Sequence, residues 1–428
     1  MANKTIQTPR GTRDVLPEDQ IYYRHIEKIA RGVLDGLGYN QISLPHFESV
    51  ELFNRSIGDA TDIVQKELFL LESRKDSADA AQYALRPEGT AGCVRSYIQN
   101  GMGSWPQPVK LYYSGAMFRY ERPQKGRYRE FNQIGAEIFG DATARTDYLT
   151  IMTSWEILSR LGIKNMLVYA NSIGCEKCRP KYITKLKKYY KDNFSKLCGS
   201  CQSRYEKNPL RLLDCKEAHC QEISKNAPST LDNLCTDCKK HFSQTLEYLD
   251  YFNIKYDLDP SLVRGLDYYN KTVFEIVETT DLGRNNTLCG GGRYDGLVEQ
   301  LGGVATPAVG FSIGVERLVS IMKEQGIVPD KIRQVEVCIL QLGEKAKEVS
   351  KKVYDELSKN DINVFFIPSD EGLRPQIKYA DKLGARYAAI IGQQEAVKNE
   401  VILKDLKNSS QEIFPVENIA AAIKKYIS

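Results

Sequence analysis

The sequence lacks long hydrophobic runs and carries little excess charge. No stretch approaches the roughly 18 apolar residues that a membrane span needs, and the polar segment from Met1 to Arg13 has no apolar core of a signal peptide. The formal net charge is +4, which permits a local basic patch for nucleic acid but does not indicate one. We therefore expect a cytoplasmic protein that makes no contact with a membrane.

The remaining composition is typical of a soluble globular protein. Charged residues make up 27% of the chain and apolar residues 42%. Because 428 residues are more than one hydrophobic core usually organises, we expect two to four domains.

Residues 118–140, FRYERPQKGRYREFNQIGAEIFG, predict a β-hairpin with a polar face. They follow a strand-like run at 109–113, and the segment 131–139 alternates in character. Side chains two apart on a strand share a face, so Gln133 and Glu137 point the same way. The predicted face carries Arg119, Glu121, Phe131, Gln133 and Glu137. This mixture suits an anionic, aromatic ligand with a polar tail, although an ordinary charged surface hairpin has the same pattern.

Two helices are predicted before this hairpin. The first runs from about Pro17 to Gly36, with an apolar side, and the strand-like segment 38–45 follows it. The second runs from Ala91 to Ile98 and begins after a turn, because Pro87 excludes the helical conformation at the residue before it. Glu88 and Thr90 lie at this turn, where an acid and a hydroxyl can also act simply as helix caps.

Eight of the eleven cysteines lie in the middle of the chain, in four pairs. In a cytosolic protein such spacing indicates a metal rather than disulfides. The first two pairs have spacing that fits one tetrahedral, structural zinc site closely, and the last two pairs could form another. An interleaved pairing is equally allowed, His219 or His241 could replace a thiolate, and buried thiols without metal are the alternative. The candidate ligands are Cys175, Cys178, Cys198, Cys201, Cys215, Cys220, Cys235 and Cys238.

The sequence after Pro329 alternates short strands and helices and predicts an α/β domain of about 95 residues. Strands are expected at 335–340, 364–367, 387–391 and 401–403, and helices at 345–360 and 376–383.

Several stretches, taken in order, resemble the signatures of one enzyme family. Residues 118–140 resemble motif 2 of the class II aminoacyl-tRNA synthetases, and residues 310–317 resemble motif 3. Residues 262–269 and 290–295 resemble two signatures of the histidyl-tRNA synthetases of bacterial type. Residues 38–45, with the helix before them, resemble motif 1, which forms the dimer interface in class II synthetases.

The resemblance implies an α+β fold: the class II antiparallel sheet flanked by helices, a cysteine-rich insertion, and a C-terminal α/β anticodon-binding domain. The implied boundaries are 1–170 and 258–328 for the two parts of the catalytic domain, 171–257 for the insertion and 333–428 for the anticodon-binding domain. Residues 373–376 of the last domain would lie close to the anticodon, with Pro375 where the family commonly has a second basic residue.

The resemblance also implies a function. A histidine–tRNA ligase activates L-histidine with ATP and Mg²⁺ to histidyl-adenylate, then transfers the histidyl group to the 3′ end of tRNA(His). The alternative is a synthetase-like regulatory paralogue of histidine biosynthesis, without aminoacylation activity. Such paralogues lack the anticodon-binding domain and tend to lose the ATP-contacting residues, both of which this chain keeps. We therefore expect the ligase, as a homodimer.

The site residues are carried over motif by motif. The implied catalytic residues are Arg119, Arg264 and Arg317. The histidine pocket would contain Glu88, Gly89, Thr90, Arg119, Gln133, Glu137, Arg264, Tyr268 and Tyr269. The ATP site would contain Arg119, Glu121, Phe131 and Arg317. Arg264 would act as a fixed cation at the α-phosphate, the alternative being a surface pair with Asp267.

The implied tRNA contacts come from two places. Gln124 and Arg129, in the loop of motif 2, would meet the acceptor end. The insertion would hold the acceptor arm through phosphate contacts, although a solvated helix face has the same composition. Its basic residues are Lys185, Lys187, Lys188, Lys191, Lys196, Arg204, Lys207 and Arg211.

Overall fold

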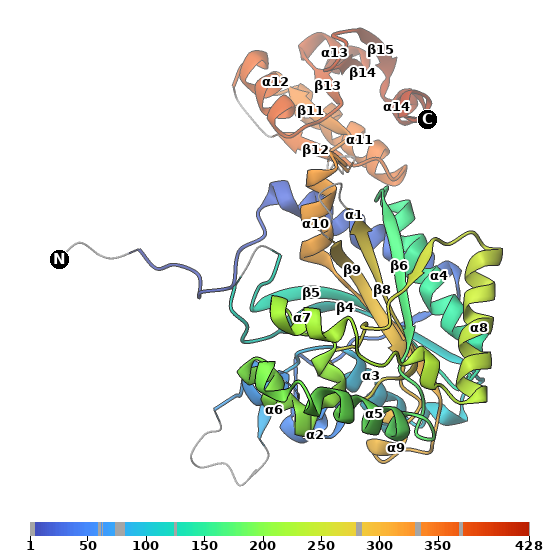
Figure 1. Cartoon of the computed structure of the whole chain (residues 1–428). Coiled ribbons are helices and arrows are strands. Elements are labelled where there is room, and N and C mark those ends of the chain that lie inside the picture. Colours follow the sequence, from blue (N-terminus) through green and yellow to red (C-terminus); the bar gives the residue numbers. More distant parts are fainter. Residues whose placement is uncertain are drawn as a thin grey trace. The chain divides into compact units, whose positions relative to one another are not determined.

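The computed structural model describes residues 5–58, 61, 63–72, 82–123, 126–279, 285–329, 335–367 and 371–427. The chain forms two compact units, Met1–Pro329 and Asp330–Ser428 (Figure 1). The predicted insertion lies within the first unit, and its exact limits stay predictions. None of the helices in the described ranges is long and apolar enough to span a membrane.

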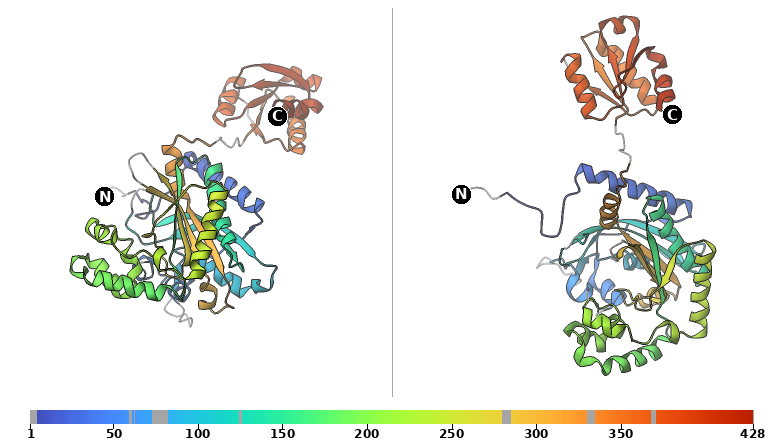
Figure 2. Two further views of the ribbon diagram at one scale, coloured as in Figure 1. Left: turned by 45° about the vertical axis from the view of Figure 1, so that its right-hand side comes forward. Right: turned by 45° about the horizontal axis from the view of Figure 1, so that its top comes forward.

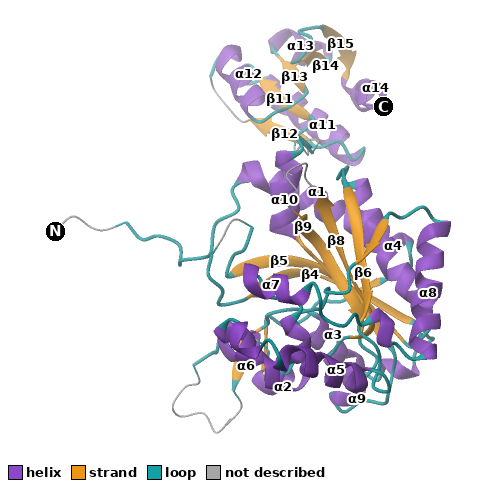
Figure 3. Ribbon diagram, in the orientation of Figure 1, coloured by secondary structure: helices purple, strands orange, loops and turns teal. Residues whose placement is uncertain are grey.

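An eight-stranded sheet forms the centre of the first unit (Figure 3). The pairs at its two ends, β1–β4 and β6–β7, are parallel, and the five pairs between them are antiparallel. In spatial order the strands are β1 (Asn40–Gln41), β4 (Val109–Phe118), β5 (Glu130–Phe139), β10 (Ala308–Gly314), β9 (Asn285–Arg293), β8 (Asn270–Thr279), β6 (Met166–Ser172) and β7 (Tyr256–Leu258). The mainly antiparallel sheet expected from the sequence is thus confirmed.

Alternation along the strands separates two apolar cores on the two faces of this sheet. On β5, Ile134, Ala136 and Ile138 point into the first core, while the residues between them point the other way. The first core is covered by α1 (Pro17–Gly36), α4 (Ala144–Arg160), α8 (Thr236–Tyr251) and α10 (Val315–Glu324). The second is covered by α3 (Thr90–Gln99) and the short helices of the insertion. The views of Figure 2 separate the insertion helices (green) from α1 (blue).

The helix ends follow from the sequence. Helix α1 begins with Pro17, whose missing N–H is not needed there, and carries acids in its first turn. Smaller elements of this unit are β2 (Phe47–Ser49), which pairs with β3 (Tyr83–Leu85), α2 (Val50–Ile57), a turn of π-helix (Ile63–Glu67), a 3₁₀ turn (Met102–Ser104) and α9 (Leu297–Gln300).

Between β6 and α8 the chain forms a series of short helices. They are α5 (Arg179–Lys191), α6 (Gly199–Lys207) and α7 (Ala218–Ser224), with 3₁₀ turns at Phe194–Lys196, Pro209–Leu212 and Leu231–Asn233.

The second unit is a five-stranded sheet in the order β12-β11-β13-β14-β15. Its elements are β11 (Val337–Gln341), α11 (Ala346–Lys359), β12 (Val364–Ile367), α12 (Leu373–Lys382), β13 (Tyr387–Ile391), α13 (Gln393–Lys398), β14 (Glu400–Asp405), β15 (Gln411–Pro415), a 3₁₀ turn (Val416–Asn418) and α14 (Ile419–Ile427). Helix α12 begins three residues before the predicted start, because a proline is tolerated in a first helical turn. Gln376 is buried and bonded to the backbone of Gln341, so it holds α12 to the sheet.

Candidate active site

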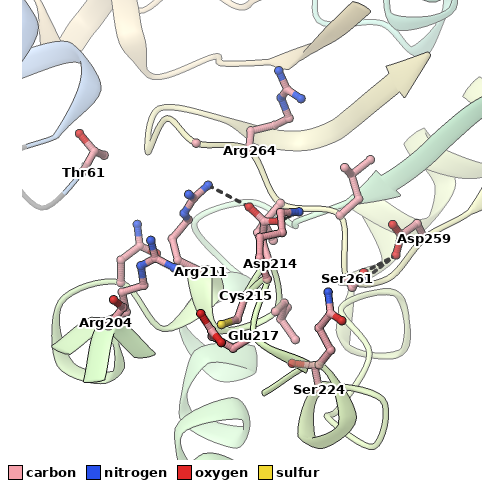
Figure 4. A pocket seen from close by; sticks show the side chains of 18 of the residues that line it. Thr61, Arg204, Arg211, Asp214, Cys215, Glu217, Ser224, Asp259, Ser261 and Arg264 are labelled. Atoms are coloured by element: carbon pink, nitrogen blue, oxygen red, sulfur yellow. Dashed lines mark hydrogen bonds and ion pairs between the residues drawn. The ribbon is translucent and has the colours of Figure 1, made fainter. Parts of the chain in front are cut away.

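A deep cleft lies between the central sheet and the insertion. Its volume is about 1350 Å³, above the roughly 300–1,000 Å³ typical of small-molecule sites, which leaves room for more than one substrate. Arg119, Glu121 and Arg264 line the sheet side. Figure 4 shows Arg264 on that side, and on the insertion side Arg211 paired with Asp214 at 3.4 Å. Two of the three predicted catalytic residues, Arg119 and Arg264, therefore share one cavity, and Arg317 is not among the residues that line it.

Arg264 is held in place by an acid on β8. Its guanidinium donates a hydrogen bond to the Glu275 carboxylate, which also accepts one from the Thr287 hydroxyl at 3.0 Å. Arg317 donates to the Thr287 carbonyl at 2.7 Å, so a single residue of β9 links the two arginines. Burial opposes the charge of Arg264, but the Glu275 carboxylate raises its pKa above the ordinary value. Glu275 thus takes the place of the expected alternative partner, Asp267.

The glycine run on β9 makes room for the side chains beside it. A Cβ atom on Gly290 would lie 2.3 Å from the Arg264 guanidinium, and one on Gly292 would lie 2.9 Å from the Tyr269 ring. Both distances are shorter than any real van der Waals contact, so bare backbone is required where these two groups lie against the strand.

Arg119 is positioned by backbone and by an aromatic ring. Its Nε donates to the Pro87 carbonyl at 2.9 Å, and its guanidinium carbon lies 5.4 Å from the centroid of the Phe131 ring. Glu121 lies 3.9 Å from Arg119 and 3.5 Å from Arg127. Three of the four predicted ATP residues therefore meet at one place.

Glu137 is a fully buried acid ringed by hydroxyl groups. It accepts hydrogen bonds from Thr90 at 2.7 Å and Tyr113 at 3.1 Å, and another from Tyr294. Burial raises the pKa of Glu137 to about 8, although these hydrogen bonds oppose the rise. A carboxyl group that changes charge near neutral pH is suited to a polar, ionisable ligand.

Glycines on the neighbouring backbone make room for the Glu137 carboxylate and for the Tyr113 ring that bonds it. Gly310 pairs with Glu137 across β10 and β5, and a Cβ atom on it would lie 1.6 Å from a Glu137 oxygen. Gly89 and Gly135 stand in the same relation to the Tyr113 ring, at 2.2 and 2.3 Å. The predicted pocket residue Gly89 is thus needed where it is for packing.

Glu88 caps helix α3. Its carboxylate oxygens accept from the backbone N–H groups of Thr90 at 2.6 Å and Ala91 at 2.9 Å. Burial raises its pKa, and the backbone hydrogen bonds oppose that rise. The capping role accounts for one hydrogen bond to each oxygen, and a contact of Glu88 with the substrate ammonium stays a prediction.

Three predicted site residues have buried polar atoms without a hydrogen-bond partner in the described part of the chain. The atoms are Gln133 Oε1, the Tyr268 hydroxyl and Arg264 Nε. An unpaired buried polar atom costs about 1–3 kcal/mol, a cost that a bound ligand would remove. Tyr268 packs against Tyr269, with ring centroids 4.7 Å apart, and edge-to-face against Tyr294 at 5.5 Å. Since Tyr294 bonds Glu137, the unsatisfied Tyr268 hydroxyl lies close to the buried acid.

Of the two residues predicted to meet the tRNA acceptor end, Gln124 lies outside the described residues. Arg129 packs on the Tyr120 ring at 3.8 Å and donates to the Glu121 carbonyl at 3.3 Å. Its backbone N–H donates to the Gly11 carbonyl at 2.7 Å. The N-terminal segment therefore braces the loop of motif 2, and a contact of Arg129 with tRNA stays a prediction.

The eight cysteines of the insertion form two four-sulfur clusters. The outer cluster contains Cys175, Cys178, Cys235 and Cys238, and the inner cluster contains Cys198, Cys201, Cys215 and Cys220. Within each cluster the sulfur atoms all lie within 4.8 Å of one another. The predicted consecutive pairing is therefore wrong. The pairs are nested, neither consecutive nor interleaved, because the insertion folds back and returns the start of α8 to the end of β6.

Neither cluster includes a histidine. His241 instead lies 2.6 Å from Asp147 of α4. Asp147 also pairs with the fully buried Arg293, which is bonded to Asp295 at 2.9 Å. This network of ion pairs and hydrogen bonds joins α4, α8 and β9.

Four residues of the site were missed from the sequence. They are Tyr113, Glu275, Thr287 and Tyr294. Tyr294 stands inside one of the two histidyl signatures and could have been found from it. Glu275 and Thr287 alternate normally on their strands, and nothing in the sequence distinguishes them.

Comparison with known proteins agrees with this geometry. The family described as "Histidyl-tRNA synthetase" matches residues 11–174 and 194–318, and "Anticodon binding domain" matches 336–426. A histidine–tRNA ligase of Acetivibrio thermocellus is 44% identical over 418 residues, 98% of this chain and 99% of that protein. The crystal structure of apo S. aureus histidyl-tRNA synthetase has a TM-score of 0.81 at 34% identity, covering 98% of this chain and 100% of that one. An ATP phosphoribosyltransferase regulatory subunit/histidyl-tRNA synthetase from Bacillus halodurans has a TM-score of 0.62 at 22% identity, covering 91% of this chain and 98% of that one, a likeness of fold alone.

Proposed function

The chain belongs to the histidyl-tRNA synthetase family, and from that membership we propose how its cleft works. Its function is that of a histidine–tRNA ligase, an ATP-dependent enzyme that joins histidine to tRNA. The single observation that carries the proposed mechanism is the buried acid Glu137, which Tyr294 links to Tyr268 and its unsatisfied hydroxyl group. Glu137 and Gln133 bind the polar groups of histidine, and Tyr268 and Tyr269 close the pocket.

Activation takes place where the arginines meet. A carboxylate oxygen of histidine attacks the α-phosphorus of ATP, and pyrophosphate leaves. Arg119 and Arg264 offer guanidinium groups to the negative charge that builds on the α-phosphate, in positions fixed before the reaction by Pro87 and Glu275. No covalent intermediate with the protein is needed.

The remaining ATP contacts come from residues beside Arg119. Glu121 binds the adenine amino group, and Phe131 stacks on the adenine ring. Arg317 covers the other face of the ring and reaches the γ-phosphate, since a planar guanidinium serves both tasks.

The volume of the cleft leaves room for the end of a tRNA beside histidyl-adenylate, so the histidyl group can be transferred there. A hydroxyl of the terminal nucleotide of tRNA attacks the carbonyl carbon of histidyl-adenylate, and AMP leaves. Gln124 and Arg129 meet the acceptor end, and the arginines on the insertion side, Arg204 and Arg211, contact its phosphates.

The magnesium ion that accompanies ATP takes mostly phosphate and water ligands. Among the described residues that line the cleft, Glu275 is paired with Arg264, and Glu121 lies within ion-pair distance of Arg119 and Arg127. Neither acid belongs to a dedicated metal cage.

We also propose that the cysteine clusters hold structural zinc. Zinc–thiolate bonds of about 2.3 Å in a tetrahedron put sulfur atoms about 3.8 Å apart. Neighbouring sulfur atoms lie 3.8 to 3.9 Å apart in the outer cluster, and the Cys198–Cys215 distance in the inner cluster is 3.8 Å. Zinc bound there contributes to folding and takes no part in the chemistry.

Assembly and location complete the proposal. Motif 1 supports a homodimer, and Arg86 fixes its last residues by donating to the Leu44 and Pro45 carbonyls at 2.7 and 3.2 Å. A stable, fully active monomer in sedimentation at micromolar concentration would refute the dimer. The cytoplasm suits the enzyme because tRNA charging and free thiols both belong there.

The regulatory paralogue is disfavoured by the second unit. Such a protein would lack the anticodon-binding domain, which this chain has over 336–426. The deciding experiment is ATP–pyrophosphate exchange with a panel of amino acids, followed by charging of tRNA. Histidine alone should support exchange, with discrimination of roughly 10⁴ or more against amino acids that cannot pair the polar groups of the pocket. A chain that exchanges with no amino acid would be the paralogue.

A further inference from the structure

The outer cluster lies at the stem of the insertion. Cys175 follows the last residue of β6 by three positions, and Cys235 is the N-cap of α8. Next to Cys178, Arg179 donates to the backbone carbonyls of Ile173 and Tyr269. The cluster therefore joins the two ends of the insertion at a point bonded directly to the segment that carries the histidine-pocket tyrosines.

The inner cluster lies in the wall of the cleft. Cys198 is the N-cap of α6, and Cys215 follows the turn that carries Arg211. Both cysteines line the cleft themselves, as do Arg211 and Asp214 (Figure 4). The inner cluster and the proposed tRNA contacts are thus parts of one short segment.

Apart from the inner cluster, this wall is held to α5 by hydrogen bonds, from Tyr205 to the Lys187 carbonyl at 3.1 Å and from Tyr189 to the Ile223 carbonyl at 2.7 Å. Helix α6 has nine residues and α7 has seven, and neither length is stable alone in water. Cys201 is the one buried residue of α6, and Cys220 is the one buried residue of α7, among the described side chains. The one fully buried side chain of each short helix is thus a cysteine of the inner cluster, and small scaffolds are commonly stapled by a metal or by disulfides.

The sulfur atoms are arranged for a metal rather than for disulfides. At 3.8 to 3.9 Å they are far beyond the ~2.05 Å of an S–S bond. Backbone N–H groups point at them: Cys175 N–H donates to Cys178 Sγ, and Cys198 N–H donates to Cys220 Sγ, both at 3.3 Å. Such contacts stabilise thiolate ligands from outside the metal shell.

We propose that the chain binds two zinc-type metal ions with separate tasks. The ion of the outer cluster fastens both ends of the insertion to the Tyr269 segment. The ion of the inner cluster holds α6, the Pro209–Leu212 turn and α7 as the wall against which the tRNA end lies. The second task rests on the proposed function.

Metal content tests the two sites without any activity measurement. The full-length protein, purified with reductant and zinc, should contain two zinc ions per chain. The double variants Cys201→Ser/Cys220→Ser and Cys178→Ser/Cys238→Ser should each contain one, and the matched control Cys338→Ser, in the second unit, should contain two. A wild-type chain with fewer than two ions, or a double variant that keeps both, overturns the proposal.

Two further measurements cover a variant that fails to fold. Two equivalents of Co²⁺ added to the metal-free wild-type chain should each produce the absorption of tetrahedral thiolate coordination, and saturation at one equivalent would contradict two sites. Cys220→His keeps a zinc ligand, so it should contain two ions and charge tRNA normally. Loss of the inner ion in this variant would argue against a metal in that cluster.

The division of tasks has its own test. In the inner-cluster variant the KM for tRNA should rise about 10-fold or more, as expected when phosphate contacts are lost, while histidine-dependent pyrophosphate exchange stays within about 3-fold. The outer-cluster variant should raise the KM for histidine as well. Normal charging by an inner-cluster variant that has lost its ion would sink the wall role. Absence of exchange in the wild-type chain would instead refute the proposed function and leave the metal count standing.

Discussion

Arg264 and Glu275 form a hydrogen-bonded ion pair on the sheet side of the cleft. The pair fixes a partly buried guanidinium before any substrate arrives, and the buried Nε of Arg264 has no partner within the described residues. Preorganised donors of this kind stabilise charge in a transition state at no cost of reorganisation. The ion pair therefore suits Arg264 to stabilising negative charge in the transition state, a role that a surface ion pair would not give it.

Replacing Arg264 by alanine should slow adenylate formation at least ~100-fold, because one preorganised donor is worth on the order of 3–4 kcal/mol. Lysine should recover little, since it keeps the charge but not the planar fork. ATP–pyrophosphate exchange measures the effect. Charging from pre-formed histidyl-adenylate should suffer much less. Arg160→Ala, which removes an exposed arginine of α4, is the control. Near-normal exchange in Arg264→Ala would end the assignment.

Gly290→Ala should move Arg264 without unfolding the chain. The added methyl would meet the flexible end of the arginine, not backbone, so the guanidinium can shift away from its working position. We expect exchange to fall at least about 10-fold, which corresponds to 1.4 kcal/mol, with a small change in Tm. Gly296→Ala is a matched control, because a Cβ atom there meets nothing within 4 Å. Equal activity of the two variants would contradict the contact.

Glu137→Ala should raise the KM for histidine strongly and leave the KM for ATP nearly unchanged. Removing one partner of a buried hydrogen bond costs about 1–3 kcal/mol, so the expected rise is roughly 5- to 150-fold. Steady-state exchange kinetics give both constants. Glu130→Ala, exposed at the start of the same strand, serves as control. An unchanged histidine KM in Glu137→Ala would move the residue out of the pocket.

Glu137 should also make stability depend on pH. Burial raises its pKa from 4.5 to about 8, so between these values the folded chain holds a proton that the unfolded chain has lost. The free energy of unfolding therefore falls as the pH rises from about 5 to about 8, by at most about 1.4 kcal/mol per unit. The Glu137→Gln variant lacks this titrating group. The difference between its Tm and the wild-type Tm should therefore shift in favour of the variant as the pH rises from about 5 to about 8. A difference in Tm that stays constant with pH would show that Glu137 titrates normally.

The N-terminal segment should affect tRNA more than histidine. The Arg13 guanidinium lies 4.7 Å from the Tyr128 ring centroid and donates to the Tyr23 hydroxyl at 2.8 Å, so it steadies the loop of motif 2. Losing a cation–π contact of about 0.5–1 kcal/mol predicts a severalfold rise in the KM for tRNA in Arg13→Ala. Arg24→Ala, on the exposed side of α1, should change nothing. A rise in the KM for histidine alone would show that the N-terminal segment supports the histidine site and not the contacts with tRNA.

The elements around the hairpin of motif 2 could be predicted because their patterns are local. Alternation marked the segment 131–139, and β5 is found at Glu130–Phe139. It also indicated that Gln133 and Glu137 share a face, and both are buried on it. The late elements β15 and α14 were missed, since β15 is a short, largely exposed strand with no clear alternation.

Parts of the site that depend on tertiary contacts could not be predicted. Glu275 gains its role from Arg264, which is eleven residues earlier on a loop, and the intervening sequence contains no sign of the pairing. The cysteine spacings fit consecutive zinc sites as well as nested ones, and the path of the insertion decides between them. At Glu88 the sequence cannot separate two roles, because a helix cap and a contact with a ligand both require an acid at this turn.

The lack of a side chain at Gly310 has a consequence for redesigning this enzyme. Any larger residue there would collide with the Glu137 carboxylate at once, so position 310 cannot contribute new contacts to a different amino acid. The collision can be relieved only by changing the acid as well, which removes the feature being redesigned. If Glu137 binds histidine as proposed, a change of specificity has to begin at the neighbouring tyrosines, Tyr268 and Tyr269, rather than at Gly310.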